Sequence, residues 1–142
     1  MAYKQLTLTL TTPDKKLLTD VAVEEVFVPG YRGELNILPG HAPLMTTLST
    51  GLLRYRLKGQ TEVHTVVVSW GYCEVNPHGV LILAETAERA EDIDAERALA
   101  AWKLASERLD SVELDEANIE KFRRKKHRAE MRQVVKGTSA TH

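Results

Sequence analysis

The sequence is poor in the residues on which several classes of protein depend. It has one cysteine, Cys73, in 142 residues, so no disulfide can form within the chain. This cysteine count, together with the lack of a signal-peptide pattern in the first residues, predicts a protein of the reducing cytoplasm. We expect Cys73 to be a small buried apolar residue. No apolar run approaches the roughly 20 residues of a spanning helix, so any link to a membrane should pass through a protein partner.

Motifs for catalysis, metal binding and phosphate binding are also missing. The sequence has neither a Walker loop nor a G-x-G-x-x-G pattern, and its five histidines are scattered without metal-ligand spacing. His41 follows a Pro-Gly turn and could serve as a base, but no nucleophile motif accompanies it. We therefore predict no catalytic residue and no metal ligand, and we interpret His41 as a hydrogen-bonding or interface residue.

The charges are balanced overall but divided along the chain. Lys+Arg total 19 and Asp+Glu total 20, whereas residues 86–116 hold 10 acidic and 4 basic side chains and residues 117–142 hold 2 and 8. The basic run "KFRRKKHR" at 121–128 has one aromatic residue, Phe122, which disfavours nucleic-acid binding because no stacking platform is present. Two interpretations stay open: a solvated or self-neutralising helix face, and a docking face for an acidic protein surface.

Residues 4–84 carry the pattern of an all-β domain. Short runs rich in Val, Leu and Thr alternate with period two and are broken every eight to twelve residues by Gly, Pro or Asn. In "GLLRYRLKG" the apolar Leu53 and Tyr55 alternate with Arg54 and Arg56, so one face should meet a core and the other water. About eight or nine such strands would leave apolar faces wet in a single sheet, which predicts a small β-sandwich.

Residues 85–136 contain no Gly or Pro and are rich in Ala, Glu, Arg, Lys and Leu, a composition typical of helices. We predict one helix over 90–110, a break at 111–118, and a second helix from 119 that ends at Gly137, forming an antiparallel hairpin. The expected apolar stripe is thin and consists of Ile93, Leu104, Ile119, Phe122, Ala129 and further alanines. A hairpin that buries so little apolar area should be held weakly and be able to leave its docking site.

Several segments together resemble the epsilon subunit of the F-type ATP synthase. They are "TPDKKLL", "VEEVFVPGYRGELNILPGHAPLMTTLSTGLLR" and "SWGYCEVNPHGVLILAETAERAEDID", followed by the helical pair. The order "GELNILPGHAPL", "TGLLR", "GYCEVNPHGVLILAE" and "AERAEDIDAERA" is the most specific part. The resemblance covers the whole chain and implies a ten-stranded β-sandwich at 1–85, a mobile regulatory hairpin at 86–136 and a flexible tail at 137–142.

The resemblance also implies a non-catalytic rotor subunit in the central stalk. In that family the sandwich contacts the gamma subunit and the ring of c subunits, and it couples proton-driven rotation to ATP synthesis in the alpha/beta catalytic head. The helical hairpin folds down or extends into the head, where it inhibits ATP hydrolysis. Such a subunit needs no cofactor, binds no nucleic acid, and is peripheral on the cytoplasmic face of the bacterial inner membrane.

Three sets of site residues follow from the resemblance. Glu34 and His41 match the loop that faces the c ring. The second helix supplies candidates for docking to the catalytic beta subunits: Arg123, Arg124, Lys125, Lys126 and Arg128. A pattern that binds regulatory ATP in some members is matched by Glu88, Ile93, Asp94, Arg97 and Ala98.

Other interpretations remain at this stage. The ATP pattern departs from the ATP-binding members near Leu104, where they carry another basic residue, and Asp94 and Arg97 are also ordinary helix-start chemistry, a cap and an ion pair. For the whole chain, the alternatives are a stand-alone β-sandwich that binds a small ligand or peptide and a hydrolase that uses His41. Aromatic residues make up only 6% of the chain, which disfavours the ligand-binding module.

Overall fold

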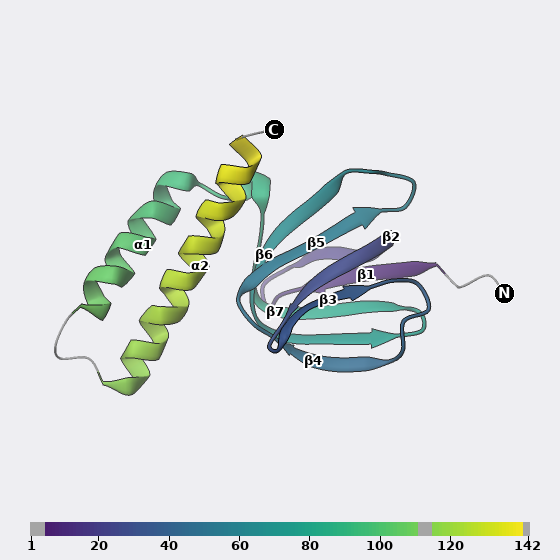
Figure 1. Ribbon diagram of the computed structural model, residues 1–142, viewed down its shortest axis with the longest axis horizontal. Coiled ribbons are helices and arrows are strands. Elements are labelled where there is room, and N and C mark those ends of the chain that lie inside the picture. The colour runs from purple at the N-terminus through teal and green to yellow at the C-terminus, as the bar shows by residue number, and fades with distance from the viewer. Residues whose placement is uncertain (1–4, 111–114, 141–142) are drawn as a thin grey trace. The chain divides into compact units, whose positions relative to one another are not determined.

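The structure is a computed structural model that describes residues 5–110 and 115–140, with side chains described as far as residue 136. The chain divides into two compact units, Met1–Ala87 and Glu88–His142. Within the described residues, seven strands build the first unit, and a short 3-10 turn and two α-helices build the second (Figure 1). The predicted order of a β domain followed by a helical pair is confirmed.

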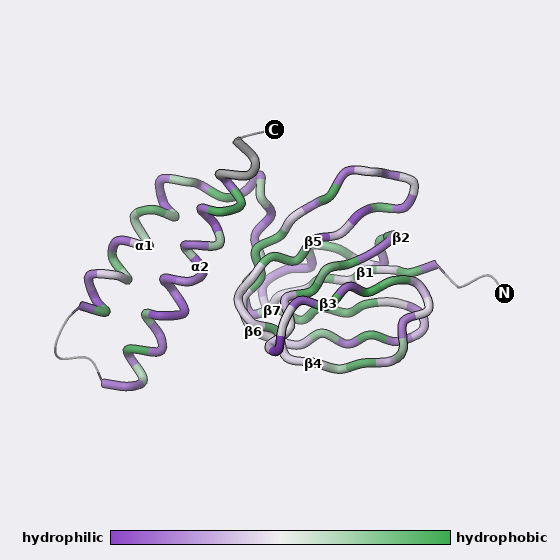
Figure 2. Tube along the Cα trace, in the orientation of Figure 1, coloured by the Kyte–Doolittle hydropathy of each residue, from purple (hydrophilic) through white to green (hydrophobic). Residues whose placement is uncertain are grey.

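The strands follow the period-two pattern of the sequence. They are β1 Leu6–Thr11, β2 Lys16–Gly30, β3 Gly33–Ile37, β4 Leu44–Leu48, β5 Gly51–Leu57, β6 Val63–Asn76 and β7 Gly79–Arg89. In β1 the leucines are buried and the threonines between them are half-buried, and in β5 the side chains of Leu53 and Tyr55 are buried as predicted. Figure 2 shows the same alternation of hydropathy along the strands.

Hydrogen bonds join the strands into one sheet that returns on itself. The order is β1-β7-β6-β4-β2-β3, with β5 pairing both β2 and β6, and β1 also pairing β2. The β1–β7 pair is parallel, from Thr7 opposite Gly79 to Thr11 opposite Leu83. Among the described strands, every one except β3 therefore pairs with at least two others, and the inward side chains of all seven form one core. This is the predicted small β-sandwich.

The implied number of ten strands is wrong, and so is the eight or nine expected from turn residues. Two strands are long, β2 with 15 residues and β6 with 14. The first half of β6 pairs with β5 and the second half with β4. Between the halves, Trp70 has φ 54° and Gly71 has φ 136°, so the strand bends from one layer to the other without ending. Seven continuous strands thus supply two layers.

The helices begin and end at other residues than predicted. The 3-10 turn η1 covers Ala90–Asp92, and α1 begins at Ala95, not at 90, because Asp94 caps it: one carboxylate oxygen accepts from the N–H groups of Glu96 and Arg97 at 2.9 and 3.2 Å. Helix α1, Ala95–Leu109, is followed by residues 111–114, the first half of the predicted break, which lie outside the described residues.

Helix α2, Glu116–Ala140, begins three residues before the predicted start and continues past Gly137. At its start, the Asp115 carboxylate accepts from the N–H of Asn118 at 2.8 Å, which caps the helix earlier than expected. A single glycine costs a helix only about 1 kcal/mol, so it need not end one. Of the predicted tail, residues 141 and 142 lie outside the described residues, and its flexibility stays a prediction.

The interior of the helical unit is thin, as predicted, but its members differ. Ile93 and Ala129 are buried as expected, whereas Leu104 is 55% exposed, so its place in the stripe is wrong. Ile119 and Phe122 are half-buried. The other buried apolar residues are small: Ala98, Ala105 and Val135. Figure 2 shows α2 as mostly hydrophilic with scattered apolar positions.

Among the residues described, neither helix contains an apolar stretch of the length that a bilayer crossing requires.

Candidate interaction sites

Glu34 lies at the start of β3, directly after the tight β2–β3 turn, and its side chain is exposed on the outer face of the sandwich. Both of its carboxylate oxygens accept hydrogen bonds from Nη2 of Arg54 on β5, at 2.9 and 2.8 Å. The Arg54 guanidinium in turn lies over the ring of Phe27 on β2, with Cζ 4.7 Å from the ring centroid. The predicted contact residue is therefore exposed and already ion-paired.

His41 lies beyond the other end of β3. Its backbone N–H donates to the Leu38 carbonyl at 3.1 Å, and its ring Nδ1–H donates to the Ala42 carbonyl at 2.8 Å. The imidazole is thus held by its own loop, in the hydrogen-bonding role expected for it. The extended chain of β3 separates Glu34 from this turn, at about 3.3 Å per residue. The family resemblance implied a single loop carrying both residues, whereas the structure places them on two different turns.

The five residues of the ATP-binding pattern have different roles in the structure. Ile93 and Ala98 are buried apolar residues, and Asp94 caps α1. Arg97 is exposed, and its backbone N–H is bonded to Asp94. The interpretation of Asp94 as a helix cap is therefore confirmed. The exposed guanidinium of Arg97 remains accessible to an anion beside it.

Glu88, the fifth residue of that pattern, forms an ion pair with Arg132 on α2. Both side chains are largely buried, at 30% and 22% exposed, and both belong to the helical unit. The pair ties the C-terminal half of α2 to the start of the unit. Sequence reasoning did not select Arg132; the opposite charges of residues 86–116 and 117–142 left pairing between the two segments open as one of two interpretations.

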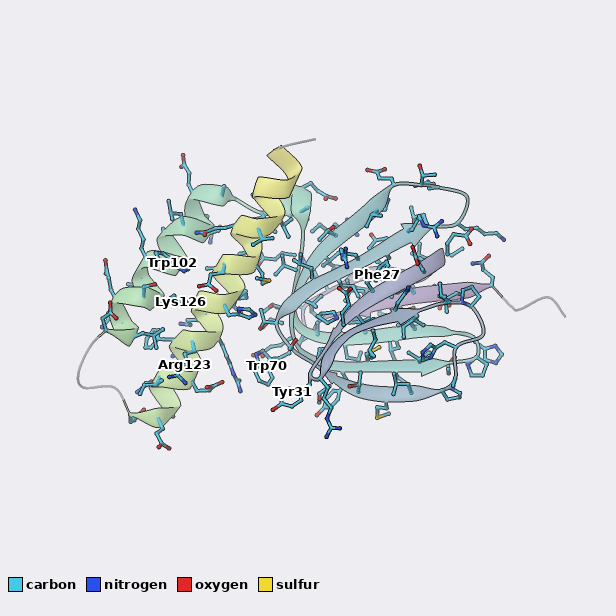
Figure 3. All side chains as sticks on the ribbon, in the orientation of Figure 1. Phe27, Tyr31, Trp70, Trp102, Arg123 and Lys126 are labelled. Atoms are coloured by element: carbon cyan, nitrogen blue, oxygen red, sulfur yellow. The ribbon has the colours of Figure 1, made fainter. Side chains whose placement is uncertain are left out.

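The five basic candidates of α2 are not equivalent. Arg123, Arg124 and Lys125 are exposed, whereas Lys126 and Arg128 are half-buried. The Arg124 Nε–H donates to Glu120 one turn earlier, at 3.4 Å. The ammonium group of Lys126 lies 5.3 Å from the ring centroid of Trp102 on α1, and Figure 3 shows these two side chains between the helices.

Trp102 is the centre of a contact between the helices that sequence reasoning missed. Its indole N–H donates to the Glu130 carboxylate at 3.0 Å, and the His127 ring lies 3.7 Å from the other oxygen of Glu130. We call Trp102, Lys126, His127 and Glu130 the Trp102 cluster. It joins α1 to α2 through polar and aromatic contacts in a hairpin whose buried residues, apart from Ile93, are alanines and Val135.

Exposed apolar side chains gather on the outer face of β4, β6 and β7. Met45, Tyr72 and Leu83 are 70%, 57% and 45% exposed, and with Glu74 and Leu81 they line a hollow. We call these five residues the apolar patch. An apolar surface of this kind usually marks a site of contact with a partner. Its signal in the sequence was the presence of Tyr72 and Leu83 at positions of β6 and β7 where water-facing residues are normally polar.

Cys73, next to the patch in sequence, points into the core. Its side chain is fully buried, and this burial raises the pKa of the thiol to about 12. The thiol is therefore protonated and unreactive in the folded protein, as predicted for a small buried apolar residue.

Comparisons with known proteins agree with the architecture. The family model described as "ATP synthase, Delta/Epsilon chain, beta-sandwich domain" matches residues 5–90. An "ATP synthase epsilon chain" of Bdellovibrio bacteriovorus is 55% identical over 87 residues, a match that covers 61% of this chain and 62% of that relative. A protein of the same name from Citrifermentans bemidjiense is 39% identical over 137 residues, which cover 96% of this chain and 97% of the relative.

A solved structure matches both units of the chain. It is a chain in the "OSCP/F1/c-ring" structure of the Euglena gracilis mitochondrial ATP synthase, with a TM-score of 0.79 and 27% identity, covering 97% of this chain and 82% of that one. The family model accounts for the sandwich, and the relative that is 39% identical extends the match through the helical unit. The chain therefore belongs to the ATP synthase epsilon chain family.

Proposed function

We propose that this chain is a non-catalytic central-stalk subunit of a proton-translocating ATP synthase. It couples rotation of the c ring to ATP synthesis in the alpha/beta catalytic head, and its C-terminal helices inhibit ATP hydrolysis. The observation that carries the proposal is the length of the match to an epsilon chain, 96% of this chain and 97% of the relative, which includes both units. A stand-alone ligand-binding sandwich would not require the helical unit.

The sandwich, residues 1–85, provides the contacts with the rotor. Glu34 and His41 contact the c ring, a role that their exposed or half-exposed side chains at the two ends of β3 allow. The apolar patch contacts the gamma subunit, because covering Met45, Tyr72 and Leu83 removes apolar area from water at roughly 25 cal/mol per Å². A polar contact to the ring and an apolar contact to gamma would hold the subunit to both parts of the rotor.

The helical hairpin, residues 86–136, is the mobile regulatory part. Its buried interior consists mainly of alanines and is supplemented by exposed or half-buried polar contacts, so its local opening should cost less free energy than that of the sandwich. The exposed Arg123, Arg124 and Lys125 can contact an acidic segment of the catalytic beta subunits without rearrangement of the hairpin, Arg124 by exchanging its hydrogen bond to Glu120. Lys126 and Arg128 become fully available only when the hairpin rearranges.

The chain is peripheral on the cytoplasmic face of the bacterial inner membrane and reaches the membrane only through the complex. Bacterial relatives named ATP synthase epsilon chain support this location. The subunit needs no cofactor for coupling. ATP bound to the hairpin near Arg97 would act as a regulator and not as a substrate.

Removal of the helical unit tests the inhibitory role. A variant that ends at Ala87 retains the first compact unit with its core. Assembled into the synthase, it should support proton-driven ATP synthesis close to that of the full chain while ATP hydrolysis rises. Unchanged hydrolysis would refute inhibition by the hairpin, and loss of synthesis would refute the assignment of coupling to the sandwich.

A further inference from the structure

The Glu34–Arg54 ion pair crosses a strand. Arg54 on β5 is the register partner of Phe27 on β2, and Glu34 on β3 is the partner of Pro29 on β2. Strand β2 therefore lies between the two charged residues, and their side chains meet over Phe27 on the outer face of the sandwich. Figure 3 shows Phe27 on this sheet.

This geometry depends on the length of both side chains. Two strand spacings are about 9.5 Å, a gap that a long arginine and a glutamate can bridge but that a shorter pair cannot. The guanidinium is fixed twice, by the aromatic ring below it and by the carboxylate beside it, because a planar cation can stack and donate at the same time. The Glu34 carboxylate consequently has one preferred orientation although its side chain is 49% exposed.

An oriented carboxylate binds a partner better than a freely rotating one, since less side-chain entropy is lost on contact. Nη2 of Arg54 donates to one lone pair on each carboxylate oxygen of Glu34. The second lone pair of each oxygen can still accept a hydrogen bond from a partner. We propose that Arg54 is a positioning residue that fixes Glu34 for contact with hydrogen-bond donors of the c ring. This inference rests on the proposed function of Glu34 as a ring contact.

A second pair on the same face provides a matched control. Arg56 on β5 donates to Glu25 on β2 at 3.4 Å, and these two residues are direct register partners on adjacent strands. Arg56→Gln removes the same charge from the same strand as Arg54→Gln, two positions away. It leaves the Glu34–Arg54 pair and Phe27 in place.

The experiment uses the assembled synthase in inverted membrane vesicles and measures ATP-driven proton pumping per ATP hydrolysed. Arg54→Gln and Glu34→Gln should each lower this ratio severalfold, and the double variant should be no worse than either single one, because both remove the same oriented contact. Arg56→Gln should retain the wild-type ratio. All variants should unfold within a few degrees of the wild-type full chain, since an exposed pair contributes little to stability.

Glu34→Asp separates orientation from charge. It keeps the carboxylate but is one methylene too short to reach Arg54, so it should pump like Arg54→Gln. A wild-type ratio for both Glu34→Asp and Arg54→Gln, with a low ratio for Glu34→Gln, overturns the positioning role and leaves the ring contact intact. Wild-type ratios for all Glu34 and Arg54 variants overturn the ring contact of Glu34 and this inference with it, whereas the rotor assignment is tested separately by the truncation at Ala87.

Discussion

Trp102 on α1 and Glu130 on α2 are joined by a hydrogen bond of 3.0 Å in which the indole N–H is the donor. Lys126 lies over the same indole ring, and His127 lies beside the same carboxylate. Because the buried residues of the hairpin are mainly alanines, they bury little apolar area. The polar and aromatic contacts of the cluster therefore contribute a larger fraction of the hairpin's stability than such contacts do in a well-packed core. The Trp102 cluster is therefore the place where substitutions should loosen the hairpin without affecting the sandwich.

Trp102→Phe should make local opening of the hairpin less costly in free energy. It removes the N–H that bonds to a charged acceptor and weakens the cation–π contact with Lys126. Together these losses should lower the free energy of opening the hairpin by about 1–2 kcal/mol for a half-buried site. Hydrogen exchange of α1 and α2 amides measures this, with β-core amides as the internal reference. Leu104→Ala is the control, since Leu104 is 55% exposed on the same helix and its loss should change exchange little. Equal protection in wild type and Trp102→Phe would contradict the importance of the cluster.

Gly71→Ala should destabilise the sandwich severely. A Cβ at this position would lie 1.8 Å from the Leu83 carbonyl oxygen, and φ is already +136°. We expect a loss of about 3 kcal/mol or more, measured by urea unfolding of the full chain. Gly59→Ala is the matched variant, because Gly59 also has positive φ but its Cβ would meet nothing within 4 Å. Strain alone should cost it about 1–2 kcal/mol. Similar losses in both variants would refute the steric explanation.

The buried thiol of Cys73 should make stability fall at high pH. Its pKa rises from 9.0 to about 12 on folding, so above pH 9 the unfolded chain releases the proton first. The free energy of unfolding therefore has its full value, as far as this thiol is concerned, below pH 9, and it falls progressively as pH rises toward 12. Unfolding free energies of wild type and Cys73→Ala should therefore converge over that range. A thiol reagent should react only after denaturation, and rapid labelling of the native chain near pH 8 would contradict the buried position.

Two substitutions distinguish the roles of the residues at the start of α1. If ATP binds the hairpin, calorimetry should show heat at millimolar ATP that Arg97→Ala abolishes, because the exposed guanidinium would contact phosphate. Asp94→Asn retains a good helix cap but removes the charge. Unchanged ATP binding in that variant would restrict Asp94 to capping. No heat with the wild-type chain would remove the ATP proposal altogether.

Local features of the fold were predictable because each depends on neighbouring residues. The Leu/Thr alternation of β1, the helix-start chemistry of Asp94 and the break of the strand pattern at Asn76 all act within a few residues. The Asn76 side chain, for example, accepts from the N–H groups of His78 and Gly79 at 2.8 and 3.0 Å. The parallel pairing of β1 with β7 was not predictable, since it joins residues about 70 positions apart and leaves no periodic signal.

The site residues also divide into those that a local motif marks and those that depend on contacts between distant parts of the chain. The family resemblance indicated Glu34, whereas Arg54 looked like an ordinary water-facing residue of an alternating strand. Its bond to Glu34 depends on β2 lying between β3 and β5, which is a property of the sheet order. The Glu88–Arg132 pair likewise depends on how α2 passes the start of its unit, and net charge alone cannot fix that register.

Reconstitution with an ATPase head is the sharpest test of whether this chain is an inhibitory rotor subunit. The purified full chain is added to an ATPase head of alpha, beta and gamma subunits that lacks its epsilon chain. Binding is followed by size-exclusion chromatography, and steady-state ATP hydrolysis is measured in the same samples. We expect the chain to co-elute with the head and to lower its hydrolysis rate. A chain that neither co-elutes nor changes the rate would contradict it.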